Sequence, residues 1–167
     1  MRQTLSILVN NHPGVLSHVA GLFTRRGYNI ESIAAGTTED PTVTRITIVA
    51  QGDENQLQQV AKQIRKLYDV REVLDLRYSR SVTRELVLVT VYADRDRRPE
   101  VVQMASALDA RVVDLSEQTV TIEFSGNEHR IRNLLALCEG YGIKQMARTG
   151  MIALPFEWVE EAWEPML

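Results

Sequence analysis

The sequence has little of what several protein classes require. Among its 167 residues there is a single cysteine, Cys138, so neither a disulfide framework within the chain nor a cysteine-based zinc cluster can form. No apolar run approaches the ~18 residues of a membrane-spanning helix, and we therefore expect no membrane partner. The formal net charge is only −3, which gives no electrostatic attraction to nucleic acid.

Side chains that hold metals or carry out catalysis are also scarce. The candidate nitrogen and sulfur ligands for a metal are three histidines and the cysteine. No pair of them has the spacing of a strong metal site. They are His12, His18, His129 and Cys138. No Gly-x-Ser-x-Gly motif and no phosphate loop occurs, and surface solvation accounts for the carboxylates of Glu31 and Asp40. We therefore expect no metal, no catalytic residue and no cofactor in this chain.

What remains is the composition of an ordinary globular protein. Apolar residues make up 44% of the chain and charged residues 25%, which is typical of soluble domains. Met1 is followed at once by the first predicted strand, so we expect no signal or transit peptide and, by default, a cytoplasmic location. Cys138 lies on the apolar face of a predicted helix, and we expect it to be a small core residue.

The predicted secondary structure runs through the order βαββαβ twice, because strand-type runs and helix-type spacing of apolar residues alternate in that way. In the first half, strands are predicted at 5–9, 30–36, 42–50 and 70–78, and helices at 15–27 and 53–67. Asp53 and Gln56 have the spacing of a capping box. In the second half, strands are predicted at 85–92, 111–115, 119–124 and 143–149, with 151–154 as a candidate extension, and helices at 99–108 and 131–138.

This pattern predicts an α+β fold of two tandem ferredoxin-like sandwiches, each with an antiparallel sheet and two helices. We expect a first domain at 1–78, a polar linker at 79–84, a second domain at 85–154 and an acidic, aromatic tail at 155–167. A domain of this size buries only ~60% of its unfolded surface, so we expect pairing within or between chains. The tail is either disordered or docked, and its Phe156, Trp158 and Trp163 favour docking because aromatic surface is costly to leave in water.

The junction of the first strand and the first helix has the chemistry of a small anion site. Its sequence is NNHPG at 10–14. The N–H groups at a helix start have no intrahelical partner and can hold a carboxylate. Pro13 suits the first helical position, and Gly14 lets a ligand approach the backbone. The amides of Asn11 and Asn29 are candidates to line the same corner, although these residue types also occur at helix starts that bind nothing.

The second half repeats the fold without this turn. Its loop at 94–98 is longer, is charged and has no glycine before the helix, so we expect no amino acid to bind there. The basic cluster of Arg95, Arg97 and Arg98 is either a solvated loop or a docking loop. RNA-binding modules share this order of elements, but they stack bases on aromatic side chains of the sheet. Only Tyr92 and Phe124 are available in these strands, which argues against RNA binding.

Residues 5–30 resemble the ACT domain, a βαββαβ module that binds amino acids at strand-to-helix corners. Further segments narrow the resemblance to the small, regulatory subunits of acetolactate (acetohydroxyacid) synthase. They are GYNIES at 27–32, DPT at 40–42, KQIRKLYDV at 62–70 and RELVLV at 84–89. The resemblance covers residues 1–154 and is more specific in the first half than in the second, and it does not extend to the tail at 155–167.

The resemblance implies a non-catalytic subunit of branched-chain amino-acid biosynthesis. Such a subunit activates a large subunit, which carries thiamine diphosphate, magnesium and FAD, and makes it sensitive to valine. The resemblance also implies a homodimer through the first domain, with valine bound between two chains. The implied site residues are Asn11, Gly14, the backbone of Val15 and Leu16, and, from the neighbouring chain, Asn29 and Ile30. The side chains of Leu16 and Ile30 would wall the niche for the isopropyl group, and His12 has no implied ligand role.

A second function stays open beside this one. A free-standing protein with two ACT-type domains would also bind an amino acid, but it would regulate another enzyme or transcription. Co-purification with a thiamine-diphosphate enzyme separates the two functions. The sequence also leaves the effector open among valine, leucine and isoleucine, and it leaves open the stoichiometry of the holoenzyme and whether a nucleotide binds.

Overall fold

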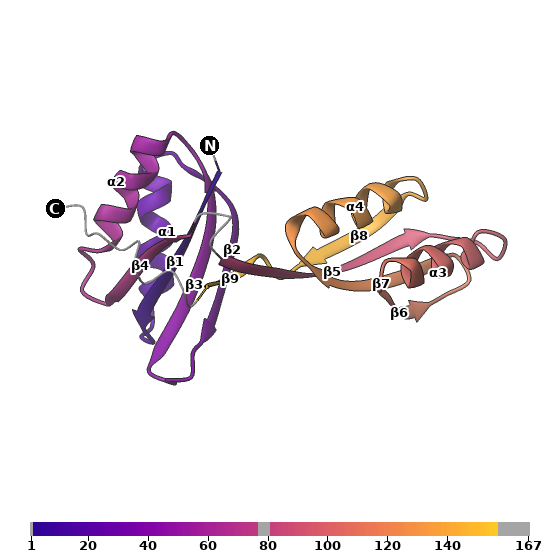
Figure 1. The fold of residues 1–167 in the computed structure, drawn as a ribbon, viewed down its shortest axis with the longest axis horizontal. Coiled ribbons are helices and arrows are strands. Elements are labelled where there is room, and N and C mark those ends of the chain that lie inside the picture. The colour runs from indigo at the N-terminus through magenta and orange to yellow at the C-terminus, as the bar shows by residue number, and fades with distance from the viewer. Residues whose placement is uncertain (1, 77–80, 157–167) are drawn as a thin grey trace. The chain divides into compact units, whose positions relative to one another are not determined.

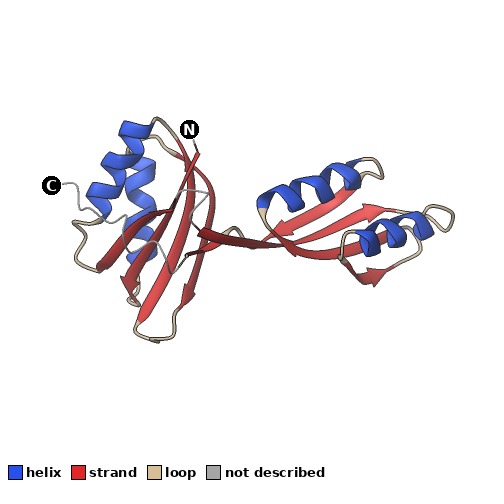
Figure 2. Ribbon diagram, in the orientation of Figure 1, coloured by secondary structure: helices blue, strands red, loops and turns tan. Residues whose placement is uncertain are grey.

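The computed structural model describes residues 2–76 and 81–156, and the account below concerns those residues. Two antiparallel sheets follow one another along the chain, and each is accompanied by two helices (Figure 1). The helices of each sheet lie on one of its faces (Figure 2). The α+β fold of two tandem βαββαβ sandwiches is confirmed. The aromatic side chains predicted to dock the tail, Trp158 and Trp163, lie outside the described residues.

The first sheet has the strand order β2-β3-β1-β4. Its elements are β1 (Arg2–Asn10), α1 (Val15–Arg25), β2 (Asn29–Thr37), β3 (Val43–Gln51), α2 (Glu54–Ile64) and β4 (Val70–Leu76). All the strand pairs are antiparallel, and β1 runs along the middle of the sheet between β3 and β4. The end of β1 therefore lies inside the sheet, where chain segments from both sides can reach it.

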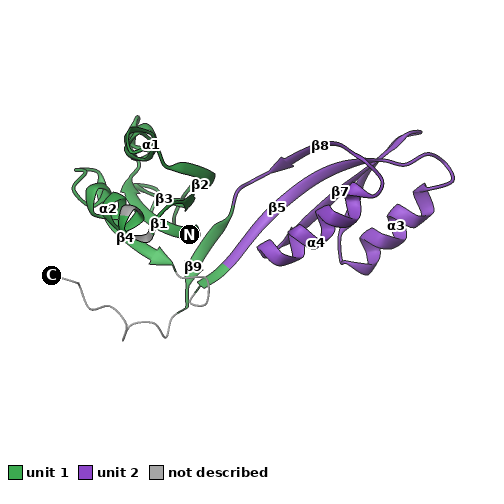
Figure 3. Cartoon of the chain, turned by 90° about the horizontal axis from the view of Figure 1, so that it is seen from above, with its two compact units in different colours: residues 1–82, 151–167 green, residues 83–150 purple. Residues whose placement is uncertain are grey.

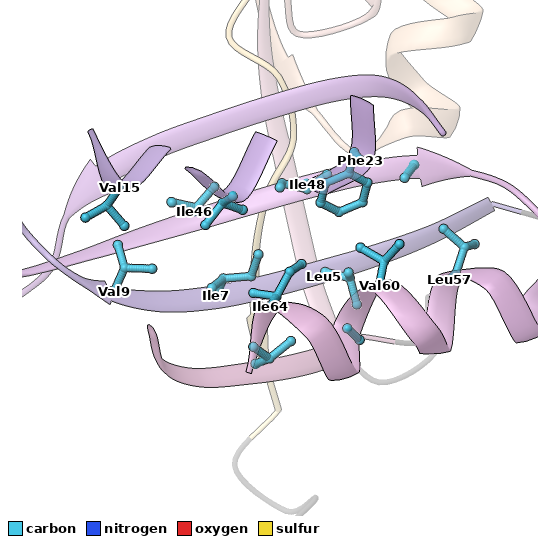
Figure 4. Close-up of a cluster of buried hydrophobic side chains, with 14 residues drawn as sticks. Leu5, Ile7, Val9, Val15, Phe23, Ile46, Ile48, Leu57, Val60 and Ile64 are labelled. Atoms are coloured by element: carbon cyan, nitrogen blue, oxygen red, sulfur yellow. The ribbon is translucent and has the colours of Figure 1, made fainter. Parts of the chain in front are cut away.

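Alternate residues of β1 build the first core. Leu5, Ile7 and Val9 are buried on the face that the helices cover, because successive side chains of a strand point to opposite faces (Figure 4). From α1, Val15 and Phe23 pack into the same cluster at helical spacing. Each fully buried side chain of this size contributes ~1.5–3 kcal/mol. The burial thus holds α1 and its N-terminal turn against the end of β1.

The second sheet has the strand order β6-β7-β5-β8, and β9 also pairs with β5. Its elements are β5 (Ser81–Tyr92), α3 (Arg98–Ala107), β6 (Arg111–Leu115), β7 (Thr119–Gly126), α4 (Glu128–Glu139), β8 (Ile143–Arg148) and β9 (Ile152–Pro155). Val87, Val89 and Val91 of β5 form the centre of its core, and Cys138 of α4 is fully buried there. Burial raises the pKa of the Cys138 thiol to about 11. The prediction that Cys138 is a small core residue is confirmed.

The chain divides into two compact units that differ from the expected domain boundaries (Figure 3). One unit comprises Met1–Val82 with Met151–Leu167, and the other comprises Thr83–Gly150. The expected linker at 79–84 is partly strand, because β5 begins at Ser81. The segment 151–154 does not extend the preceding strand. Gly150 adopts a φ of 81°, a left-handed conformation that interrupts an extended strand, and Ile152 opens a separate strand that belongs to the first unit.

The start and end of α2 also differ from the expectation. Asp53 precedes the helix, but its side chain makes no capping hydrogen bond, so the cap predicted from Asp53 is wrong. The helix ends at Ile64, where the prediction ran on to Leu67. Leu67 nevertheless packs against the first core from the following turn, where its N–H donates to the carbonyl oxygen of Ile64. Leu67 thus continues the helical spacing of apolar residues because it is partly buried against the core, although it lies outside the helix.

Candidate functional site: the strand-to-helix corner of the first unit

The turn between β1 and α1 presents Gly14 in a conformation that side chains disfavour. Gly14 has φ 87° and ψ −12°, which is the left-handed region, and it is the residue that precedes α1. The position of its absent Cβ has no atom within 4 Å. A residue with a side chain would cost roughly 1–2 kcal/mol of backbone strain there. Glycine thus leaves open space at the N-terminus of α1, as predicted.

This N-terminus carries free hydrogen-bond donors. The first bond of the helical ladder runs from the N–H of His18 to the carbonyl oxygen of Gly14 at 3.0 Å. Before it, the N–H of Val15 makes a long bond of 3.4 Å to the carbonyl oxygen of His12. The N–H groups of Leu16 and Ser17 have no acceptor among residues 2–76 and 81–156. Together with the helix dipole they form a site that suits one carboxylate.

Asn11 offers a hydrogen-bond acceptor in the turn that precedes these donors. Its side chain is exposed, and its Nδ2 donates to the carbonyl oxygen of Pro41 at 3.1 Å. Because a carbonyl oxygen only accepts, this contact sets which end of the amide is oxygen. Within the described chain the Oδ1 atom of Asn11 has no donor. It can therefore accept a hydrogen bond from an ammonium group.

Long-range contacts hold this turn in place. The N–H of Asn11 donates to the carbonyl oxygen of Thr42 at 2.8 Å, and the N–H of Asn10 donates to that of Asp69 at 2.7 Å. Asp69 Oδ1 also faces Nδ1 of His12 at 3.0 Å. His12 thus pairs with Asp69, a contact that no local pattern around His12 indicates. Sequence reasoning missed Asp69, because it lies 57 residues away along the chain.

The β2–β3 loop contributes a second set of contacts. Both the N–H and the hydroxyl of Thr42 donate to Asp40 Oδ1, at 2.8 and 2.7 Å. These hydrogen bonds, and then the nearby charge of Arg71, hold the pKa of the Asp40 carboxyl below its ordinary value of 3.8. The guanidinium of Arg71 lies 3.7 Å from Asp40 Oδ2 and donates from Nε to Asn10 Oδ1 at 2.7 Å. The loop that faces Asn11 is therefore itself fixed to β4.

Within one chain, two of the six predicted residues lie away from the corner. Asn29 pairs with Gln51 at one end of β3, whereas Asn10 pairs with Val43 at its other end. Eight residues of extended chain, roughly 26 Å, separate the two positions. Ile30 is half-buried and packs against the first core. A single chain thus brings together Asn11, Gly14, Val15 and Leu16, but not Asn29 and Ile30.

The side chains of Val15 and Leu16 have different surroundings. Val15 is buried in the core, so only its backbone faces the corner. The side chain of Leu16 is 44% exposed. It is available to an apolar group of a ligand that binds at the N–H groups.

The second unit has an equivalent corner with different chemistry. The N–H of Ala93 donates to the carbonyl oxygen of Gln118 at 2.9 Å, just before β7. This matches the bond from Asn11 to Thr42, just before β3. Ala93 therefore stands in the position of Asn11, and its methyl group cannot accept a hydrogen bond from an ammonium group.

An internal carboxylate occupies the donors of this second corner. Asp94 Oδ1 accepts the N–H groups of Asp96 at 3.1 Å and of Arg97 at 3.0 Å. A side-chain oxygen bonded to such N–H groups is a helix-capping arrangement. The structure thus gives a physical reason for the expectation that the second unit binds no amino acid.

Comparisons with known proteins agree with this fold. Residues 5–72 match the family described as "AHAS small subunit-like ACT domain", and residues 84–156 match the family described as "Small subunit of acetolactate synthase". The chain belongs to the acetolactate synthase small-subunit family. A relative from Archaeoglobus fulgidus, named "Probable acetolactate synthase small subunit", is 45% identical over 92% of this chain and 96% of its own. The acetolactate synthase small subunit of Mycobacterium bovis is 42% identical over 90% of both chains.

A solved structure of this family has the same fold over the whole pair of sandwiches. The acetolactate synthase small subunit from Thermotoga maritima superimposes with a TM-score of 0.83 at 33% sequence identity. The match covers 93% of this chain and 98% of that one. The two sandwiches are therefore the architecture of the small-subunit family.

In this member of the small-subunit family, two residues of the basic cluster have structural contacts. The guanidinium of Arg97 lies 5.0 Å from the centre of the Tyr141 ring and donates to the carbonyl oxygen of Gly140 at 3.4 Å. Arg98 donates to the carbonyl oxygens of Ser116 and Glu117 at 2.8 and 3.0 Å. These contacts fix the loop to its own unit, an outcome that the charge pattern alone does not indicate.

Neither a metal-binding cluster nor a membrane-spanning helix occurs in the described part of the chain. Residues 2–76 and 81–156 contain no group of three or more His, Cys, Asp or Glu side chains that could hold a metal ion. Over the same residues, no helix has the length and apolar character that crossing a membrane requires.

Proposed function

We propose that this chain is the non-catalytic regulatory subunit of acetolactate synthase and that it senses valine at the corner of its first unit. It raises the activity of the large subunit, which carries thiamine diphosphate, magnesium and FAD, and it makes that activity sensitive to the end product. The observation that carries the proposal is the pairing of free donors with a free acceptor. The N–H groups of Leu16 and Ser17 are free at the start of α1, and the Oδ1 atom of Asn11 is free in the turn that leads into this helix.

A free amino acid complements this arrangement. Its carboxylate accepts from the N–H groups of Leu16 and Ser17, and its ammonium group donates to Asn11 Oδ1. A branched aliphatic side chain then covers the exposed side chain of Leu16. Each part of the ligand thus meets a group of matching chemistry.

A second chain completes the site. β2 lies at the edge of its sheet, so one side of its backbone is open to another strand. Antiparallel pairing of two β2 strands about a two-fold axis at Ile33 sets Asn29 of the partner subunit beside Thr37. Thr37 pairs with Thr44 at the same end of β3 as Asn10. The partner subunit's Asn29 thereby approaches the corner, which it cannot reach within one chain.

Regulation follows from this shared site by linkage. Valine shifts the activity of the large subunit only if it binds one arrangement of the dimer more tightly than another. A ligand held between two chains meets this condition, because its contacts depend on how the chains are placed. The second unit, which has no site of its own, supports contact with the large subunit.

Reconstitution with the large subunit tests the proposal. The chain is titrated onto the purified large subunit, and acetolactate formation is followed at increasing valine, leucine and isoleucine. We expect activation by the chain and inhibition by valine only when the chain is present. Binding of an amino acid to a chain that neither co-purifies with the large subunit nor activates it would favour the free-standing regulator instead.

A further inference from the structure

The corner is held by partly exposed polar side chains that lie far from it in the sequence. We propose that Asp69 and Arg71 are positioning residues for the amino-acid site, acting through Asn10 and His12 and touching no ligand themselves. This inference rests on the proposed function for the identity of the ligand.

Asp69 contacts both residues that flank Asn11 in the sequence. Its carbonyl oxygen accepts the N–H of Asn10 at 2.7 Å, and its Oδ1 accepts Nδ2 of the same residue at 3.2 Å. On the other side of Asn11, Nδ1 of His12 lies 3.0 Å from the same Oδ1 atom. The two residues that flank Asn11 are therefore both bound to the carboxylate of Asp69.

Arg71 and Asp40 close these contacts into a ring. Arg71 donates to Asn10 Oδ1 at 2.7 Å and lies 3.7 Å from Asp40, which accepts from the N–H of Thr42 at 2.8 Å. The carbonyl oxygen of Thr42 accepts the N–H of Asn11 at 2.8 Å. The ring thus runs from Asn11 through the β2–β3 loop and β4 back to Asn10.

A role in global stability does not explain this ring well. Arg71 and Asp40 are about half exposed, with side-chain exposures of 47% and 48%, and His12 is 63% exposed, whereas Asp69 is 24% exposed. Exposed ion pairs contribute little to the stability of a fold. Binding groups, in contrast, lose affinity when the shell that supports them allows small displacements. The ring is placed to hold Asn11 Oδ1 and the Gly14 turn in one geometry.

Calorimetry with the full chain and valine tests the inference. We expect Asp69→Ala to weaken valine binding about tenfold or more. We expect Asp69→Asn to recover part of that loss, because an amide oxygen still accepts from Asn10. The matched control is Asp109→Asn, a carboxylate in the second unit that is 89% exposed and lies 3.5 Å from Arg130. Its affinity for valine should equal that of the wild type.

Amide NMR spectra of the ligand-free chain give a readout that does not need the ligand. In Asp69→Ala we expect the side-chain amide signals of Asn11 and the backbone signal of Gly14 to move, while those of the second-unit core stay in place. Arg71→Gln should do the same, with Arg111→Gln as its control, because Arg111 is exposed and only 3.9 Å from Glu123.

The outcomes separate this inference from the proposed function. Wild-type affinity and unmoved Asn11 signals in Asp69→Ala would overturn the inference alone. A wild-type chain that binds no valine, leucine or isoleucine would overturn the proposed function, while the ligand-free spectra still decide the positioning role. Unfolding of every variant at Asp69 and Arg71 would also overturn the inference, because these residues would then support the fold and not the corner.

Discussion

The substitution Gly14→Asp should abolish the response to valine while leaving the chain folded. The new side chain has room, because no atom lies within 4 Å of the Cβ position. Its cost is the left-handed backbone at φ 87°, roughly 1–2 kcal/mol for a residue with a Cβ and less for aspartate, which tolerates this region. We therefore expect a loss of about 1 kcal/mol in the free energy of unfolding.

The effect on binding should be far larger than the effect on stability. A carboxylate at position 14 competes with the ligand for the N–H groups of Leu16 and Ser17, which have no other acceptor in the described part of the chain. Each hydrogen bond to a charged group is worth ~1.5–3 kcal/mol. The loss of two such bonds, about 3–6 kcal/mol, corresponds to roughly a 10²- to 10⁴-fold weaker affinity.

Calorimetry, thermal unfolding and reconstituted activity together decide this prediction. The variant should activate the large subunit as the wild type does, but valine should no longer inhibit it. Gly14→Ala separates backbone strain from charge. Gly142→Asp places the same charge at a glycine with φ 88° in the second unit, where the added Cβ also lies 3.3 Å from the Tyr92 ring. Undiminished inhibition in folded Gly14→Asp would refute the assignment of the site to this corner.

Three further expectations follow from the same structure. Asn11→Ala and Asn29→Ala should each weaken valine binding by roughly tenfold to a hundredfold, since each removes a hydrogen bond of ~1.5–3 kcal/mol to a charged group; calorimetry that finds both affinities unchanged would move the ligand elsewhere. The chain should bind one valine per copy, because Asp94 already occupies the donors of the second corner; a calorimetric stoichiometry of two would contradict this. Cys138 should not react with a thiol reagent at pH 8 until the protein unfolds, because it is fully buried and its pKa is raised to about 11. In the unfolded chain the thiol ionises near its ordinary pKa of 9.0, whereas in the folded chain it stays neutral up to about pH 11. The free energy of unfolding should therefore fall as pH rises from 9.0 towards about 11, which denaturant titrations can measure.

Several features of the corner could be predicted because they depend on short stretches of chain. The alternation of Leu5, Ile7 and Val9 indicates a strand with an apolar face, and both the strand and the burial of these three residues are observed. Pro13 and Gly14 mark a helix start, and Gly14 has the unusual backbone expected there. The placement of Pro13 as the first helical residue is wrong, because α1 begins at Val15 and Pro13 lies one residue before its N-cap, Gly14. Turn chemistry of this kind acts within a few residues, so the sequence displays it directly.

Other features depend on how distant segments meet, which no local pattern records. The sequence by itself determined the order of the elements, the apolar faces that pack together and the glycine turn with its free N–H groups. Only the tertiary structure decided that Asp69 and Arg71 hold Asn10 and that Asn29 lies at the far end of the sheet from Asn11. Strand register is the physical reason. It is set by packing and hydrogen bonding across the whole sheet, and it fixes which residues of β3 and β4 stand beside the end of β1.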